Sequence, residues 1–280
     1  MKPAAFEYER AYTVDEALVL LSQSTDARLL AGGQTLGPML NLRLVQPQLL
    51  VDITRIKALV RSEINANTVT LGACVSHAAI EDVRMPDATH GFLPRVASGI
   101  AYRAVRNRGT IGGSLANADP TADWLSCFTA LEAQILISGP KGRRTSSIDK
   151  FVTGAMETTL EEAGEMINGV RFPTLSKGAR CGYAKISRKP GEFADAIAAI
   201  VHDPDNGRCR VVVGTTNGVP RQLAIDPLAL SASAPLPQRL NSGAVREQLA
   251  SHLPATDVYG LNIQCAVIER ALANAHQITS

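Results

Sequence analysis

The stretch NRGTIGGSLANADPTADW, residues 107–124, places two adjacent glycines among small and β-branched residues and then passes through an Asp-Pro pair. An earlier stretch, LLAGGQTLGPML at residues 29–40, also combines a glycine pair with apolar and hydroxyl side chains. Glycine lets the backbone approach a ligand closely and adopt positive φ, so that successive N–H groups can form an anion-binding concavity. The two stretches therefore predict either one shared phosphate-binding site or two unrelated turns.

The surroundings of both glycine pairs favour the shared site. The first pair lies between an expected strand and an expected helix, and the second lies between two expected helices. A helix N-terminus adds unpaired donors and a favourable dipole for an anion. Hydroxyl groups of Thr35, Thr110 and Ser114 are further donors. Neither loop contains Lys or Arg, so we expect neutral backbone N–H groups to bind a diphosphate.

Two common phosphate-binding motifs are absent from the sequence. A P-loop requires a lysine directly after its second glycine, and although Gly32 and Gly37 have the P-loop spacing, Pro38 occupies the lysine position. No GxGxxG follows an expected strand, which excludes the usual Rossmann fingerprint. A diphosphate site in this chain would therefore be of another type.

The composition indicates a soluble globular protein. The chain has 280 residues, 45% of them hydrophobic and 19% charged, with a net charge of +2. Interspersed charges argue against a nucleic-acid partner, which requires a concentrated basic face. The basic cluster GPKGRR at 139–144 has the composition of a hairpin turn. No apolar run is long enough to span a bilayer and the N-terminus does not resemble a secretory signal, so we expect a cytoplasmic protein.

The cysteines and histidines predict no metal site on this chain. The five cysteines are widely spaced and include no CxxC pair, which indicates free thiols rather than a disulfide framework or an iron–sulfur ligand set. The five histidines form no HxxxH pair.

The order of expected elements predicts an α+β protein with two domains, 1–173 and 174–280. In the first domain, one lobe at about 1–55 begins with a capping box, Thr13 with Glu16, ahead of an amphipathic helix. The second lobe covers 56–173. In the C-terminal α+β domain we expect a three-stranded antiparallel sheet followed by two helices.

A helix is expected directly after the second glycine pair. Asp119 is placed to cap it, and Pro120 would be its first residue. Asp123 would then lie one turn further on, either solvated or bonded to a sugar or ribityl hydroxyl of a ligand. A carboxylate beside a phosphate is repulsive, so it should face the polyol part. Asn117 could offer its amide to the same ligand.

Four segments together resemble a known family: LLAGGQTLGPMLNLR, RNRGTIGGSLANADPTAD, GEMINGVRFP and GYAKISRKPGEFADA. They are similar to the medium, FAD-binding subunits of the molybdenum hydroxylases, which include flavoprotein subunits of carbon monoxide dehydrogenase and of quinoline and nicotine oxidoreductases, and the flavin domain of xanthine dehydrogenase. The resemblance runs nearly end to end in the same order. It implies a two-lobed FAD-binding domain of the vanillyl-alcohol-oxidase (PCMH) type, followed by a small C-terminal domain.

The resemblance also implies which residues bind FAD. In the first stretch they are Leu30, Ala31, Gly32, Gly33, Gln34, Thr35 and Leu36; in the second they are Thr110, Ile111, Gly112, Gly113 and Ser114; the others are Ile100, Asn117, Asp123, Ile167, Tyr183 and Lys185. Both glycine loops would hold the diphosphate, and Ile167 would act through its backbone. Ser114 stands where many members have Asn.

Three of these residues would lie near the flavin ring. Lys185 matches a lysine near the ring, where its charge would favour the reduced anionic flavin. Tyr183 matches a tyrosine over one ring face, and Ile100 an apolar or aromatic ring contact. An ordinary strand tyrosine and an ordinary core isoleucine are the alternatives. The flavin itself carries the chemistry, and no catalytic residue is expected on this chain.

The implied function is electron transfer within a larger enzyme. A large molybdenum-pterin subunit would hydroxylate an N-heterocycle, an aldehyde or carbon monoxide. Electrons would pass through [2Fe–2S] clusters of a small subunit to FAD on this chain and then to an external acceptor, in an (αβγ)2 assembly. The alternatives are a stand-alone FAD oxidoreductase of the same fold and a nucleotide-binding regulatory or assembly protein. Reduction of the flavin by partner and substrate separates the regulatory protein from electron transfer.

Overall fold

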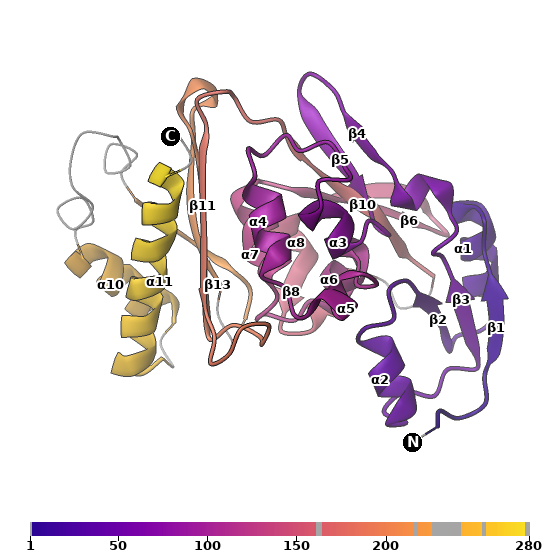
Figure 1. Ribbon diagram of the computed structural model, residues 1–280. Helices are drawn as coiled ribbons and strands as arrows, with labels where there is room; N and C mark the ends of the chain where they lie inside the picture. The colour runs from indigo at the N-terminus through magenta and orange to yellow at the C-terminus, as the bar shows by residue number, and fades with distance from the viewer. Residues whose placement is uncertain (1, 161–163, 215–217, 226–241, 254–255, 278–280) are drawn as a thin grey trace.

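The computed structural model describes residues 2–160, 164–214, 218–225, 242–253 and 256–277. Across these residues the chain runs from a small parallel sheet, through a five-stranded sheet covered by short helices, to a four-stranded sheet that carries the last two helices on its outer face (Figure 1). The mixture of helices and sheets confirms the α+β class.

The first sheet is parallel and has the order β1 (Glu7–Arg10), β3 (Leu49–Asp52), β2 (Ala27–Leu30). Helix α1 (Val14–Ser22) connects β1 to β2. The expected N-cap is confirmed: Thr13 Oγ1 accepts a hydrogen bond from Glu16 N at 3.1 Å. The Glu16 carboxylate accepts one from Tyr12 N at 2.7 Å, one residue before the N-cap, and not from Thr13 N as a complete capping box would require. After β2, the first glycine pair leads into α2 (Leu36–Asn41).

The second sheet is antiparallel, in the order β4 (Ser62–Ile64), β5 (Thr68–Gly72), β10 (Met166–Pro173), β6 (Gln134–Gly139), β7 (Gly142–Ser147). The basic GPKGRR segment forms the tip of the β6–β7 hairpin, as its turn composition predicts. The remaining elements of this part are η1 (Lys57–Val60), α3 (His77–Glu81), α4 (Phe92–Ser98), α5 (Arg103–Arg106), α6 (Ile111–Asn117), α7 (Asp123–Ala130), α8 (Ile148–Phe151), β8 (Val152–Gly154) and β9 (Glu157–Thr158).

The C-terminal sheet has four strands, so the expected three-stranded sheet is wrong. Its order is β11 (Arg180–Ile186), β12 (Ala196–Asp203), β13 (Arg208–Gly214), β14 (Arg221–Leu223), all antiparallel, with η2 (Pro204–Asn206) in the turn between β12 and β13. The strand that sequence analysis missed, β14, has three residues and buries one side chain, Leu223. Three residues are too few to show the alternation that marks a strand.

The C-terminal sheet is packed on both faces. One face contacts α7, whose residues are all buried. The other contacts α10 (Ser242–His252) and α11 (Val258–Gln277). This two-sided burial explains why β12 is a nearly continuous apolar run, AIAAIVHD. Close packing of α11 requires Gly182, because a Cβ there would overlap the Ala271 carbonyl oxygen.

The helix that was expected to begin at Asp119 and Pro120 is α7, and it starts later than expected. Ala122 is the N-cap of α7, and Asp123 is its first residue. Asp119 instead accepts hydrogen bonds from Thr121 N at 2.9 Å and from Thr121 Oγ1 at 2.6 Å, which makes a local turn. The prediction failed because a turn-forming and a helix-capping aspartate have the same local sequence pattern.

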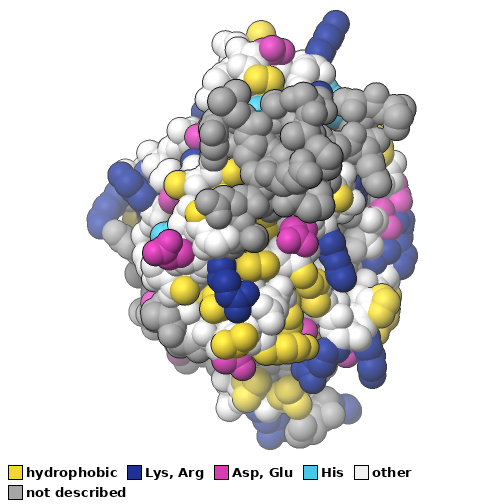
Figure 2. Space-filling model, turned by 90° about the vertical axis from the view of Figure 1, so that its left-hand side faces the viewer, with side chains coloured by type: hydrophobic (Ala, Val, Ile, Leu, Met, Phe, Trp, Pro, Cys, Tyr) yellow, Lys and Arg dark blue, Asp and Glu magenta, His cyan; other side chains and the backbone are white. Residues whose placement is uncertain are grey.

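The outer surface of α10 and α11 carries basic, acidic and hydrophobic side chains intermixed, as Figure 2 shows. None of the helices in the described ranges combines the length and the hydropathy that a bilayer crossing requires. Within the same ranges, no three His, Cys, Asp or Glu side chains are grouped as metal ligands.

Candidate functional site

The first glycine segment, residues 32–36, presents unpaired backbone donors. It follows the carboxyl end of β2, and Gly33 has φ +69°. None of its five N–H groups donates to an acceptor among the described residues. Gln34 and Thr35 are exposed, and Thr35 does not cap α2 with its side chain. A run of accessible donors without a nearby carboxylate partner suits an anion.

Two further predicted contacts flank the first glycine segment. Leu30 and Ala31 are half-buried at the end of β2, and the Leu30 carbonyl accepts a hydrogen bond from Ile53 N at 3.1 Å. The Leu30 side chain also lies beneath Gly33, where a Cβ would come within 3.2 Å of its Cδ1. The parallel sheet therefore fixes where the segment begins.

The second glycine segment, residues 110–114, is the start of α6 rather than a loop between helices. Thr110 is the N-cap, and its Oγ1 accepts from Gly113 N at 3.1 Å. Ile111 N donates to Val75 O at 3.1 Å, Gly112 N to Ala73 O at 2.8 Å, and Ser114 N to Thr110 O at 3.0 Å. The backbone donors expected here are therefore largely engaged within the fold. What the segment offers outward is the exposed, side-chain-free surface of Gly113.

The two glycine segments meet in space. A Cβ on Gly32 would overlap the Arg108 carbonyl oxygen and lie 2.9 Å from the Gly109 Cα. Likewise, a Cβ on Gly112 would lie 2.8 Å from the Ala73 carbonyl oxygen. These contacts require glycine for close backbone approach. The Gly32 contact joins the first segment to the residues directly before the second, more than seventy positions away in the sequence, as a shared site requires.

His77 supports this junction and was not identified from the sequence. A Cβ on Gly109 would lie 2.9 Å from His77 Nε2, so the imidazole packs directly against the segment. His77 Nδ1 accepts a hydrogen bond from Trp124 Nε1 at 3.1 Å, which places the imidazole proton on Nε2. Burial, and secondly the charge of Arg106, lower the pKa of His77 to about 4. It is therefore neutral at pH 7.

Asp123, Tyr183 and Lys185 form a second, largely buried group, here called the Asp–Tyr–Lys cluster. Lys185 Nζ lies 3.1 Å from Asp123 Oδ1, and the Tyr183 hydroxyl donates to the same oxygen. Burial, reinforced by the Asp123 charge, raises the pKa of Tyr183 well above its usual value, so it remains a neutral phenol. Asp123 Oδ2 has no hydrogen-bond partner among the described residues.

Ile100 lies beside this cluster, because Lys185 also donates to the carbonyl of Gly99, the residue directly before Ile100. Lys185 Nζ donates to Gly99 O at 2.6 Å, which ties β11 to the end of α4. Ile100 is half-buried against the main core. The structure thus brings together four predicted contacts from three separate parts of the sequence.

The two remaining predicted contacts, Ile167 and Asn117, are both linked to the second glycine segment, the first through backbone hydrogen bonds and the second through α6. Ile167 is buried in β10 at a bulge, and its neighbour Asn168 accepts from Ala73 N at 2.9 Å. Ala73 in turn accepts from Gly112, so one residue, Ala73, connects β10 to α6. Asn117 is half-buried and is the last residue of α6.

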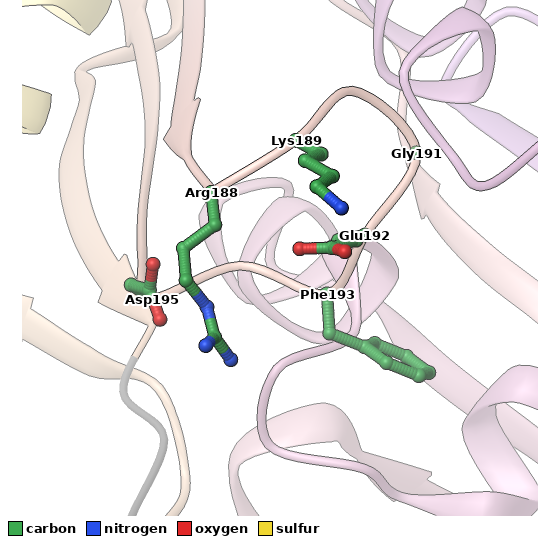
Figure 3. A pocket seen from close by; sticks show the side chains of 6 residues that line it. All are labelled: Arg188, Lys189, Gly191, Glu192, Phe193 and Asp195. Carbon is green, nitrogen blue, oxygen red and sulfur yellow. The ribbon is translucent and has the colours of Figure 1, made fainter.

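A cavity of about 410 Å³ lies in the connection between β11 and β12, and it was not predicted (Figure 3). Figure 3 shows that charged side chains line it, while the ring of Phe193 points away from them. Gly191, with φ +84°, brings this connection against the end of α4, since a Cβ there would lie 3.2 Å from the Ala101 carbonyl oxygen. The lining residues are Arg188, Lys189, Gly191, Glu192, Phe193 and Asp195.

The sequence matches a known domain family over most of its first two hundred residues. Residues 4–175 match the family described as the FAD binding domain in molybdopterin dehydrogenase. The carbon monoxide dehydrogenase medium chain of Hydrogenophaga pseudoflava is 38% identical over 225 residues, covering 80% of this chain and 78% of that one. The nicotine 6-hydroxylase medium subunit of Paenarthrobacter nicotinovorans is 32% identical over 250 residues, covering 87% and 86%.

Solved structures match the whole chain. Carbon monoxide dehydrogenase from Hydrogenophaga pseudoflava superposes with a TM-score of 0.86 at 33% identity and covers 100% of both chains. Quinoline 2-oxidoreductase from Pseudomonas putida 86 superposes with a TM-score of 0.84 at 29% identity and covers 99% of both. The family match over residues 4–175, the medium-chain relatives and the structural match over the full chain agree, and the chain therefore belongs to the FAD-binding medium subunits of the molybdenum hydroxylases.

Proposed function

We propose that this chain carries FAD between the iron–sulfur clusters of a small subunit and an external electron acceptor, while a large molybdenum-pterin subunit hydroxylates the substrate. The observation that carries the proposal is the junction of the two glycine segments at Gly32 and Gly109, which joins a row of free N–H donors to a surface without side chains. The relatives reported above are named for carbon monoxide, nicotine and quinoline, so we propose carbon monoxide, an aldehyde or an N-heterocycle as the substrate class.

The residues of the junction fit a diphosphate. The N–H groups of the first glycine segment would donate to its oxygens, and Thr35 and Ser114 would add hydroxyl donors. The bare surface of Gly113 would allow the diphosphate to approach α6. His77 keeps Gly109 in place without adding positive charge, because it is neutral at pH 7.

The Asp–Tyr–Lys cluster fits the other end of the cofactor. Asp123 Oδ2 would accept a hydrogen bond from a hydroxyl of the ribityl chain, while Oδ1 holds Tyr183 and Lys185. Ile100 and Tyr183 would contact the ring. Bound FAD supplies reversible uptake of electrons, and this chain supplies binding, orientation and tuning. Because Asp123 balances the charge of Lys185, the net field at the ring is smaller than that of a free ammonium group.

The domain division and the assembly are part of the same proposal. We place the domain boundary between β10 and β11, at 173/174, and divide the first domain near residue 55 into two lobes. We further propose an (αβγ)2 assembly in the cytoplasm. The medium-chain relatives support the assembly, and five free cysteines suit a reducing compartment.

The test is the visible absorption spectrum of the purified chain, followed by acid release of its chromophore. A flavin spectrum that releases FAD, without iron–sulfur absorbance, is expected. A colourless chain that cannot be reconstituted with FAD would refute the site. In the purified complex, substrate should bleach the flavin; a bound flavin that substrate never reduces would instead favour the regulatory alternative.

Replacing Lys185 tests the tuning role. Lys185→Met should lower the flavin midpoint potential, because removal of the ammonium leaves the Asp123 charge facing the cofactor without compensation. Lys189→Met, an exposed lysine in the neighbouring connection, is the matched control and should leave the potential unchanged. Potentiometric titration of both variants in the complex measures the difference. Equal potentials in Lys185→Met and wild type would dismiss the role.

A further inference from the structure

Three consecutive carbonyl groups at the end of α4 are each bound by a cationic side chain. Lys185 Nζ donates to Gly99 O at 2.6 Å, whereas Arg106 Nη1 donates to Ile100 O at 3.0 Å and to Ala101 O at 2.9 Å. Charge-assisted hydrogen bonds of this kind are about twice as strong as neutral ones. The segment, here called the 99–101 turn, is therefore fixed from two sides.

The 99–101 turn does not adopt a relaxed backbone conformation. Ala101 has φ +43°, in the left-handed region that disfavours residues with a Cβ. Such a conformation costs about 1 kcal/mol or more and persists only when the surroundings enforce it. Arg106 donates to the Ala101 carbonyl, and Gly191 packs against the same carbonyl group.

Arg106 is itself held by a carboxylate. Its Nε donates to Glu81 Oε2 at 2.7 Å and its Nη2 to Glu81 Oε1 at 2.9 Å. The Arg106 side chain is only 12% exposed, so solvent competes little with these bonds. The hydrogen bond from Arg106 is the main cause that lowers the pKa of Glu81, which keeps the carboxylate ionised. Arg103 reaches the same carboxylate from the surface at 2.7 Å without touching the turn.

We propose that Arg106, oriented by Glu81, is a positioning residue for the flavin ring, acting by fixing the 99–101 turn and thereby the side chain of Ile100. The proposal rests on the proposed function, since Ile100 is a ring contact only if FAD binds beside the Asp–Tyr–Lys cluster. The proposal gives the Arg106 guanidinium a role in the site although it bonds neither Asp123 nor Tyr183. Without it, Ala101 would relax, and the hydrophobic contact of Ile100 with the ring would be lost.

The experiment compares Arg106→Met with Arg103→Met in the purified complex. Both variants remove one arginine from Glu81, but only the first releases the turn. Arg106→Met should weaken FAD binding by about tenfold or more, as expected for the loss of charged hydrogen bonds. At saturating FAD it should also shift the flavin absorption bands and the midpoint potential. Arg103→Met should leave all three unchanged.

Two further variants keep the test decisive if Arg106→Met does not fold. Arg106→Lys retains the charge but cannot bond two carbonyls and the carboxylate together, and Glu81→Gln removes the charge that orients Arg106. Both should give smaller shifts of the flavin bands in the same direction. Wild-type bands and potential in every soluble Glu81 and Arg106 variant would overturn the inference. A wild-type chain that binds no FAD would instead refute the proposed function.

Discussion

The two glycine segments are similar in composition but differ in their hydrogen bonding. In the first, residues 32–36, none of the N–H groups has an acceptor among the described residues. In the second, residues 110–114, four of the five N–H groups have acceptors: the Thr110 side chain and carbonyl, and the carbonyls of Ala73 and Val75, which follow β5. Glycine allows close backbone approach in both, at Gly32 and at Gly112, but only the first segment also uses its conformational freedom, at Gly33 with φ +69°.

This difference assigns different tasks to the two halves of the site. Backbone N–H groups without an acceptor can bind a ligand, whereas N–H groups that are already hydrogen-bonded within the fold make a rigid surface that a ligand can contact. The first segment is therefore expected to determine the affinity for FAD, and the second to determine the stability of the fold around it. Substitutions that separate affinity from stability test the distinction.

The largest effect is expected at the contact that joins the two segments. Gly32→Ala would place a Cβ into the Arg108 carbonyl, and backbone on both sides prevents a local adjustment. We expect no FAD in the purified chain and a free energy of unfolding lower by about 3 kcal/mol, at the upper end of overpacking effects. Urea unfolding of the apo chain measures the second quantity.

Gly37→Ala is the matched control for that variant. A Cβ there meets nothing within 4 Å, and the position lies inside α2, where alanine is favoured over glycine. It should retain FAD and full stability. If Gly32→Ala behaved like Gly37→Ala, the two segments would not share a surface.

A smaller effect is expected from acid, through His77 at the junction of the two segments. His77 has a pKa of about 4 in the folded chain, below its usual 6.5, because burial disfavours the charged form. The unfolded chain therefore binds a proton that the folded chain does not, and stability falls as the pH falls from about 6.5 toward 4. Between pH 7 and pH 5 the contribution is about 2 kcal/mol.

The variant that isolates this contribution is His77→Gln, which keeps an acceptor for Trp124. Its free energy of unfolding should fall less between pH 7 and pH 5 than that of wild type, measured by urea unfolding at both values. Other groups, such as His202, whose pKa burial also lowers, titrate in both proteins and cancel in the difference. Identical pH dependences would show that His77 is not held neutral at the junction.

Local sequence patterns predicted the parts of the site that depend on backbone chemistry. The glycine pairs, the Thr13 N-cap and the hairpin turn each need only a few adjacent residues, so they are visible in one sequence. The Asp–Tyr–Lys cluster joins α7 to β11 across sixty positions, and whereas the helix spacing suggested Asp123, only the resemblance to a family pointed to Tyr183 and Lys185.

The parts that sequence analysis missed depend on tertiary contacts. His77 follows a serine cap and looks like any helix residue, since its Trp124 partner is 47 positions away. Arg106 reads as one arginine of an RNR stretch, and nothing local shows that it bonds the Ile100 and Ala101 carbonyls. The misplaced start of α7 arose differently, because Asp119 satisfies its hydrogen bonds in a turn before the helix begins.

The smallest effects come from a matched pair of threonines, one at the start of each glycine-associated helix. Thr110 Oγ1 accepts from Gly113 N, so Thr110→Val should cost about 1 kcal/mol of stability through the lost cap. Thr35 caps nothing with its side chain and is exposed, so Thr35→Val should leave the unfolding of the apo chain unchanged. If the first segment binds the diphosphate, Thr35→Val should instead weaken FAD binding by about fivefold to tenfold, as for one lost hydrogen bond.

Urea unfolding of the apo chains and fluorescence titration with FAD give both quantities for both variants. Stability should change only at Thr110, and affinity should change more at Thr35. The reverse pattern would exchange the tasks of the two segments, because the helix cap at Thr110 would then be dispensable and its hydroxyl would serve the ligand. Equal losses of affinity at both positions would mean that both hydroxyls face the diphosphate, because the Thr110 hydroxyl can donate to an anion while it accepts from Gly113 N.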